Sequence, residues 1–298
     1  MDKVYLVEGG LGKAIAFSAL TRKLANKDGD KIKIITPYVD VFFWSDCVKK
    51  TYHSNDYLTQ KENDEKIIYA EPYKCEYQFN DQHICEWWAE QFGIDFDKDK
   101  DLPEIMLSKE AIEVGQRAIA PYEGREIGLV QFSGGQPAEG FNPNAPYDFN
   151  LMRGIRNYPP QMANILMRRL IEKYPNILWL NFALKNEPDI WGTLKIETPY
   201  IGAFSFIHKA KYIIGIDSSL NHLCAAANKP SVALWNSHAQ ARPHKYGWRV
   251  AKHLIAANME HDYIDVINAL EAIESQEVLS LPAPVETREI NEKEGENG

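Results

Sequence analysis

The sequence predicts an α/β protein in which two Rossmann-like domains face a central cleft. Buried strand patterns alternate with helical patterns along the chain, which is typical of parallel sheets covered by helices. The first strand of each half runs into a glycine-containing turn, and a turn-rich stretch at residues 121–124 separates the two series. Open sheets of this kind bind ligands beside the carboxyl ends of their strands. We therefore expect the functional residues on the turns that follow the strands.

The first half, residues 1–122, is expected to form the N-terminal Rossmann-like domain. An apolar run at residues 4–7 ends at a glycine-rich loop, and the helical pattern that follows places Ala16, Leu20 and Leu24 on one face. Further strands are expected at 32–36, 50–53, 66–70 and 104–107, and helices at 81–92 and 108–118.

The second half, residues 123–276, repeats the alternation. Its clearest unit is a buried strand at 212–216, a polar turn, a small-residue helix at 220–228 and a second buried strand at 231–235. The other expected elements are strands at 127–132 and 177–181 and helices at 159–174, 203–210 and 261–273. The acidic segment 277–298 has few apolar residues and is predicted to be a disordered tail.

The composition is that of a globular protein. The 298 residues are 45% hydrophobic and carry a formal net charge of −9. This charge argues against a protein that binds nucleic acid non-specifically over its whole surface. No apolar run approaches the roughly 20 residues that cross a membrane, and the N-terminus lacks a signal-peptide pattern. The absence of a CxxC pair favours a reducing, cytoplasmic location. The four cysteines are Cys47, Cys75, Cys85 and Cys224.

The strongest functional signal is the turn Asp217-Ser218-Ser219, followed one helical turn later by His222. These side chains can cap the helix while its first N–H groups stay available to an anion, which suits a diphosphate. The alternative is a capped helix without a ligand, with His222 as a core histidine.

A second signal is the turn at Ser133, Gly134 and Gly135, where glycines allow a ligand to approach the backbone closely. Arg153 and Arg156 precede the helix at 159–174, and a guanidinium is a natural partner of phosphate oxygens. The alternatives are an ordinary loop and solvated arginines.

The third signal is the loop from Glu8 to Lys13, which contains Gly9, Gly10 and Gly12. It is neither a dinucleotide fingerprint nor a P-loop, because Ile15 replaces the third small residue and Ala14 follows the lysine. We expect a loop beside the cleft. The histidines of the second half show no metal-binding spacing, and 246–248 is expected to stack on a base or close the cleft.

With these residues identified, the chain resembles glycosyltransferase family 9, the heptosyltransferase-like enzymes of GT-B fold. The matching run is 217–226, followed by Lys229-Pro230 and the strand at 232–235, and the similarity covers roughly residues 125–250. The resemblance implies an acceptor domain in the first half and a nucleotide-sugar donor domain in the second. The implied contacts to the donor diphosphate are Ser133, Gly134, Gly135, Arg156, Asp217, Ser218, Ser219 and His222.

The chain departs from the family at the position of the catalytic aspartate, which is Lys13 here. An ammonium group does not accept the proton of an acceptor hydroxyl unless burial or like charge lowers its pKa strongly. We therefore expect Glu8 to be the base and Lys13 to contact a phosphate.

These features predict an inverting glycosyltransferase that needs no metal or cofactor and uses a nucleotide-diphosphate sugar. The acceptor is expected to be a lipopolysaccharide-type glycan or a modified DNA base. The alternative is a non-catalytic nucleotide-sugar-binding protein, which the lysine at position 13 favours. A third interpretation, an NAD-dependent dehydrogenase, is supported only by the pair Gly10 and Gly12 and is ranked last.

Overall fold

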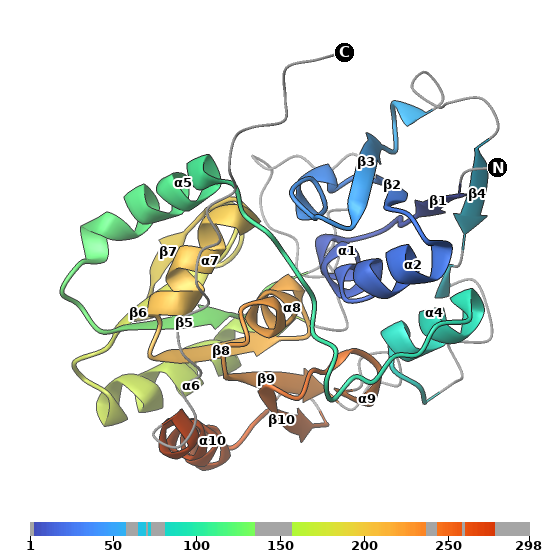
Figure 1. Cartoon of the computed structure of the whole chain (residues 1–298). Helices are drawn as coiled ribbons and strands as arrows, with labels where there is room; N and C mark the ends of the chain where they lie inside the picture. The colour runs from blue at the N-terminus through green and yellow to red at the C-terminus, as the bar shows by residue number, and fades with distance from the viewer. Residues whose placement is uncertain are drawn as a thin grey trace.

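The computed structural model describes residues 3–57, 65–69, 71–72, 81–134, 157–236, 243–257 and 260–277. It contains two parallel sheets, one in each half of the chain, that lie side by side (Figure 1). This confirms the predicted α/β fold class.

The first sheet has the strand order β3-β2-β1-β4. Its strands are β1 (Lys3–Leu6), β2 (Ile32–Thr36), β3 (Val48–His53) and β4 (Lys66–Tyr69). The helices of this half are α1 (Leu11–Ser18), α2 (Thr21–Asp28) and α4 (Ile84–Phe92), with a 3₁₀ turn at Val39–Val41. The chain order reverses between β1 and β4, which are parallel neighbours.

The second sheet has the order β10-β9-β8-β5-β6-β7. Read from β7, this is the Rossmann order 3-2-1-4-5-6, whose switch point lies between β5 and β8. The strands are β5 (Ile127–Gln131), β6 (Leu178–Phe182), β7 (Leu194–Ile196), β8 (Tyr212–Ile216), β9 (Ser231–Asn236) and β10 (Ala251–Ala256).

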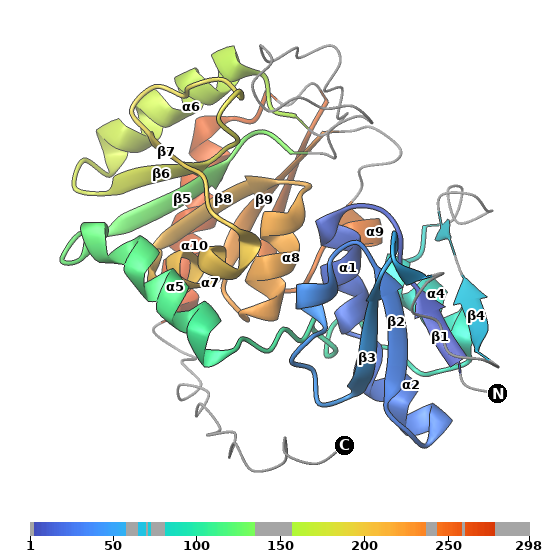
Figure 2. The ribbon, with the colours of Figure 1, turned by 90° about the horizontal axis from the view of Figure 1, so that it is seen from above.

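Helices cover both faces of the second sheet. One face carries α5, α7 and α8, and the other carries α6 and α10 (Figure 2). The bounds are α5 (Lys109–Ile119), α6 (Pro160–Lys173), α7 (Tyr200–Lys209), α8 (Ser219–Ala226), α9 (Pro243–Tyr246) and α10 (Tyr263–Glu277), with a 3₁₀ turn at Ala120–Tyr122.

The two halves meet along a seam in which α1 packs against α8 (Figure 2). The buried residues of this seam belong to one hydrophobic cluster that continues from the first sheet into α7 and α8. The division of the chain near residue 122 stays a prediction. Before that point, α5 already packs against α7 of the second half.

Two expectations about local structure were wrong. Residues 104–107 form no strand, and the N–H of Glu104 donates to the Ser18 hydroxyl at 3.0 Å instead. The first helix is broken between α1 and α2, where the hydroxyls of Ser18 and Thr21 bond to backbone carbonyls three residues earlier. Ala16, Leu20 and Leu24 nevertheless face the core as predicted. The strands β7 and β10 were not anticipated.

Within the described residues, no helix is long and apolar enough to cross a membrane. Cys47, Cys85 and Cys224 are buried free thiols. The predicted tail beyond residue 277 lies outside the described residues, as do Gly135, Arg153 and Arg156.

Candidate nucleotide-sugar site

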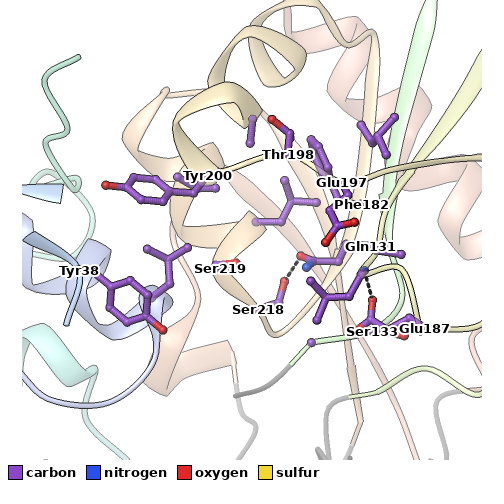
Figure 3. Close-up of a pocket in the computed structure, with 18 residues that line it drawn as sticks. Tyr38, Gln131, Ser133, Phe182, Glu187, Glu197, Thr198, Tyr200, Ser218 and Ser219 are labelled. Carbon is purple, nitrogen blue, oxygen red and sulfur yellow. Dashed lines mark hydrogen bonds between the residues drawn. The ribbon is translucent and has the colours of Figure 1, made fainter. Parts of the chain in front are cut away.

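A cavity of about 350 Å³ opens at the switch point of the second sheet. The turns after β5 and β8 form its floor with Gln131, Ser133, Ser218 and Ser219 (Figure 3). This is the place at which the sheet order predicts a ligand, because the loops of the two neighbouring strands diverge there.

The turn after β8 leaves the start of α8 without a side-chain cap. Ser218 occupies the N-cap position, but its hydroxyl donates to the side-chain oxygen of Gln131 (Figure 3). The expectation that Ser218 caps the helix was therefore wrong. The first backbone bond of the helix runs from Asn221 N–H to the Ser218 carbonyl at 3.2 Å. The N–H groups of Ser219 and Leu220 precede it and have no acceptor within the helix.

Close packing brings the two turns together. Gly134 N–H donates to the Asn157 side chain at 2.8 Å, which fixes the turn after β5. A Cβ added at Gly134 would lie 3.1 Å from the Cβ of Ser218. A larger residue at this position would push the two turns apart.

Glu187 places a fixed carboxylate on the cavity wall after β6 (Figure 3). Its Oε2 accepts from the Leu184 N–H at 2.8 Å. The pKa of this carboxyl is raised above its ordinary value, because burial outweighs the lowering by the Leu184 bond and by the charge of Lys195. An acidic residue beyond the second strand of a Rossmann unit is a typical partner of ribose hydroxyls.

The first half supplies the opposite wall of the cavity. Leu11 at the start of α1 and Tyr38 after β2 line it, and Tyr200 of α7 lies nearby (Figure 3). Burial, and then the charge of Asp40, raise the pKa of the Tyr200 hydroxyl above its ordinary value. The cavity therefore lies between the carboxyl ends of both sheets.

His222 lies in the seam between the halves and is not part of the cavity lining. The indole N–H of Trp248 donates to His222 Nδ1 at 2.8 Å, and the same indole packs edge-on against His83 of the first half. Since Trp248 is only 1% exposed, it is not open to stack on a base. A Cβ on Gly12 would lie 2.8 Å from His222 Cδ2, so α1 approaches this imidazole closely.

The glycine-rich loop after β1 carries the charged residues Glu8 and Lys13, and both have partners around β4. Lys13 is buried and its Nζ lies 2.6 Å from Glu71 Oε2, while the exposed Glu8 accepts from the Tyr69 hydroxyl at 3.0 Å. Gly9 has a φ of +98°, and a Cβ there would lie 2.7 Å from the Lys13 side chain. A residue with a Cβ would be strained here and would disturb the lysine.

The sequence located the turns correctly in the chain but missed several residues around them. Ser133, Gly134, Ser218 and Ser219 line one cavity, whereas Gly135 and Arg156 lie outside the described residues. The missed residues are Tyr38, Glu71, Gln131, Glu187 and Tyr200. Glu187 could have been found by looking for an acidic residue after the second strand of the second half. The lining tyrosines and Glu71 carry no comparable local signal.

Comparison with known proteins supports the resemblance. A model of glycosyltransferase family 9 (heptosyltransferase) matches residues 197–263, which include the cavity residues of α7 and α8. No match was found among curated proteins.

Solved structures match almost the whole chain. A glycosyl transferase family 9 protein from Veillonella parvula has a TM-score of 0.65 at 11% identity, covering 93% of this chain and 98% of its own. ADP-heptose LPS heptosyltransferase II from Escherichia coli has a TM-score of 0.60 at 16% identity, covering 93% and 100%. The E. coli heptosyltransferase WaaC, solved with ADP, has a TM-score of 0.59 at 12% identity, covering 92% and 100%.

At these identities the structural likeness establishes the fold, and the family model adds a sequence match around the second switch point. The resemblance predicted from the 217–235 region is thereby confirmed: the chain has the GT-B fold of the solved heptosyltransferases, and its residues 197–263 match glycosyltransferase family 9.

Proposed function

We propose that this chain is a cytoplasmic glycosyltransferase that moves a sugar from a nucleotide-diphosphate donor to an acceptor hydroxyl. One observation carries the proposal: the cavity at the second switch point is bounded by the starts of two helices without side-chain caps, α1 and α8. Helix N-termini present N–H donors and a partial positive charge, which suit a diphosphate.

In this proposal the donor lies along the second switch point. Ser133 and the N–H groups of Ser219 and Leu220 hold the diphosphate, Gly134 lets the ligand approach the turn after β5 closely, and Glu187 holds the ribose. The family resemblance assigns Arg156 and Asp217 to the same diphosphate site. The match to a structure solved with ADP supports an ADP-type donor.

Chemistry then follows as a single displacement with inversion at the anomeric carbon. The helix N-termini and Arg156 stabilise the charge that develops on the leaving diphosphate, and this stabilisation needs no metal. The acceptor is a lipopolysaccharide-type glycan or a hydroxyl-bearing DNA base. A protein that binds the donor without catalysis is the second candidate, favoured by the ion-paired Lys13 at the expected base position.

Ser219→Asp tests the donor site. The substitution puts a negative charge at the start of α8, which suits the helix dipole but repels a diphosphate. The matched control is Ser108→Asp at the N-cap of α5, because it adds the same charge outside the cavity.

The measurement is a thermal-shift panel of ADP, UDP, GDP, CDP and their sugars on the three proteins. A ligand at about 100 times its Kd stabilises the fold by ~2.7 kcal/mol. We expect wild type and Ser108→Asp to shift with one nucleotide class and Ser219→Asp to lose that shift. The absence of any shift in wild type, or an equal shift in Ser219→Asp, would contradict the donor site.

A further inference from the structure

The first sheet has its own switch point, which the donor site leaves unused. The strand order reverses between β1 and β4, and two acidic residues follow these neighbouring strands, Glu8 after β1 and Glu71 after β4. Ligands of open α/β sheets bind at such positions. This edge also faces the cleft, because Leu11 and Tyr38 from the same edge line the donor cavity.

The side chains at this edge form one connected polar cluster. Lys13 Nζ lies 2.6 Å from Glu71 Oε2, and the two side chains are only 6% and 10% exposed. The Tyr69 hydroxyl donates to Glu8 at 3.0 Å and is also within hydrogen-bonding reach of Glu71. Burial, and then its bond to Glu8, raise the pKa of Tyr69 to about 12, so the phenol keeps its proton. Two carboxylates thus meet at one phenol hydroxyl, and the Glu71 carboxylate is also paired with the Lys13 ammonium.

Helix α1 links this cluster to the donor cavity. Leu11 lines the cavity, Gly12 packs against the start of α8, and Lys13 makes the ion pair with Glu71. A Cβ at Gly12 would lie 3.6 Å from Ser219 Cα, which places Gly12 in the seam. Lys13 therefore follows the seam residue directly and lies two positions after Leu11 on the cavity wall.

Stability alone is a poor explanation of this ion pair. Removing two charges from water usually offsets their attraction, so a buried salt bridge is weak support for a purely stabilising role. A second ion pair in the same half allows a comparison: Lys33 and Glu65 lie 2.8 Å apart and are even more deeply buried, with side chains 3% and 1% exposed. Glu65 precedes β4, whereas Glu71 follows it at the edge that faces the cleft.

We propose that Glu71 is the catalytic base of the transfer and that Lys13 is a positioning residue that holds its carboxylate at the cleft. This inference rests on the proposed transferase function. Glu71 takes the proton as the acceptor O–H bond breaks, and the acceptor oxygen bonds to the anomeric carbon. The bond from that carbon to the diphosphate breaks, and its electron pair leaves with the nucleoside diphosphate. Glu71 later returns the proton to solvent, and the Lys13 ammonium keeps its own.

Glu71 is a better candidate for the base than Glu8 because an ion pair fixes the position of its carboxylate. A general base must be within hydrogen-bond reach of the proton that it removes, in a fixed geometry. Glu71 is held by an ion pair in a buried site, whereas Glu8 is exposed and accepts a hydrogen bond from the Tyr69 hydroxyl.

The test compares Glu71→Gln, Glu8→Gln and the matched control Glu65→Gln. Each variant replaces a carboxylate by an amide of the same shape. Glu65→Gln is the matched control because, like Glu71→Gln, it breaks a buried ion pair. Release of nucleoside diphosphate is measured with the nucleotide sugar that gives the largest thermal shift. Lipopolysaccharide core oligosaccharide and hydroxyl-bearing duplex DNA are offered as acceptors. Unfolding is followed in parallel.

We expect Glu71→Gln to lower kcat by about 10² to 10⁴-fold, the usual contribution of general base catalysis, with the KM for the donor unchanged. It should also remove the acidic limb of the wild-type pH–rate profile. Glu65→Gln should lower the melting temperature and leave kcat unchanged. A purely structural role for Glu71 predicts that the two variants behave alike, and that outcome would overturn the inference.

Two further outcomes separate this inference from the proposed function. If Glu8→Gln loses turnover and Glu71→Gln keeps it, the base is Glu8 and the inference fails while the transferase stands. If wild type binds the donor but releases no diphosphate with any acceptor, both the transfer reaction and its base are overturned.

Discussion

Gly12→Ala probes the seam on which the two-sided cavity depends. The added methyl group would lie 2.8 Å from His222 Cδ2 and 3.2 Å from Nε2. Carbon atoms in contact prefer about 3.5–4.0 Å, so the shortfall is at least about 0.7 Å. The imidazole cannot move aside cheaply, because Trp248 holds its Nδ1 at 2.8 Å from the other side.

The expected cost follows from two opposing effects. Overpacking of this kind costs about 1–3 kcal/mol, and replacing glycine by alanine in a compatible conformation regains about 0.4–1 kcal/mol. We therefore expect a net loss of about 1–2 kcal/mol of unfolding free energy. If α1 and α8 separate to relieve the clash, nucleotide affinity falls as well, because Leu11 and Ser219 line the cavity on the two sides of the seam.

The assay is urea denaturation together with nucleotide titration, and the matched control is Gly10→Ala. A Cβ at Gly10 meets no heavy atom within 4 Å, and the φ of −78° suits alanine. Gly10→Ala should keep wild-type stability to within ~0.5 kcal/mol. If Gly12→Ala matches Gly10→Ala in both measurements, the close packing of α1 on α8 is refuted.

Three further predictions concern buried polar groups. Trp248→Phe should cost about 1–3 kcal/mol in chemical denaturation, since His222 Nδ1 loses its donor. An unchanged midpoint would contradict that bond. Burial, and then the charge of His222, lower the pKa of His83 to about 3. The unfolded chain therefore binds more protons below pH 6.5, and stability should fall by ~2 kcal/mol between pH 7 and pH 5. His83→Asn, which keeps a helix-capping acceptor, should remove that part of the pH dependence. Lys33→Met should cost about 3–5 kcal/mol by leaving Glu65 buried without its ammonium partner. Adding Glu65→Leu should recover most of that loss, and additive losses would argue against the pair.

The sequence was sufficient where the signals were local. The strand, turn and helix at 212–228 were predicted because a buried apolar run, a polar turn and small residues follow one another directly, and β8 and α8 lie there. The segment 104–107 was mistaken for a strand because its apolar residues Ile105 and Leu107 pack half-buried against the core. The N–H of Glu104 bonds to the Ser18 hydroxyl and not to a neighbouring strand.

The side chains around the cleft could not be predicted as a group, because they are brought together by contacts between residues far apart in the sequence. Lys13 and Glu71 are separated by 58 positions, and nothing near either residue indicates the other. His222 illustrates the same limit, since its place in the seam is set by Trp248 and by the approach of Gly12 from the other half. The strand order that reveals both switch points is likewise a property of the folded sheets.

The most direct test of the central claim is a structure of the chain with the nucleoside diphosphate that gives the largest thermal shift. The account predicts that the β-phosphate accepts bonds of about 2.7–3.2 Å from the N–H groups of Ser219 and Leu220. The ribose hydroxyls should lie against the Glu187 carboxylate. A nucleotide bound away from the turns after β5 and β8, or with its phosphates turned away from α8, would contradict the account.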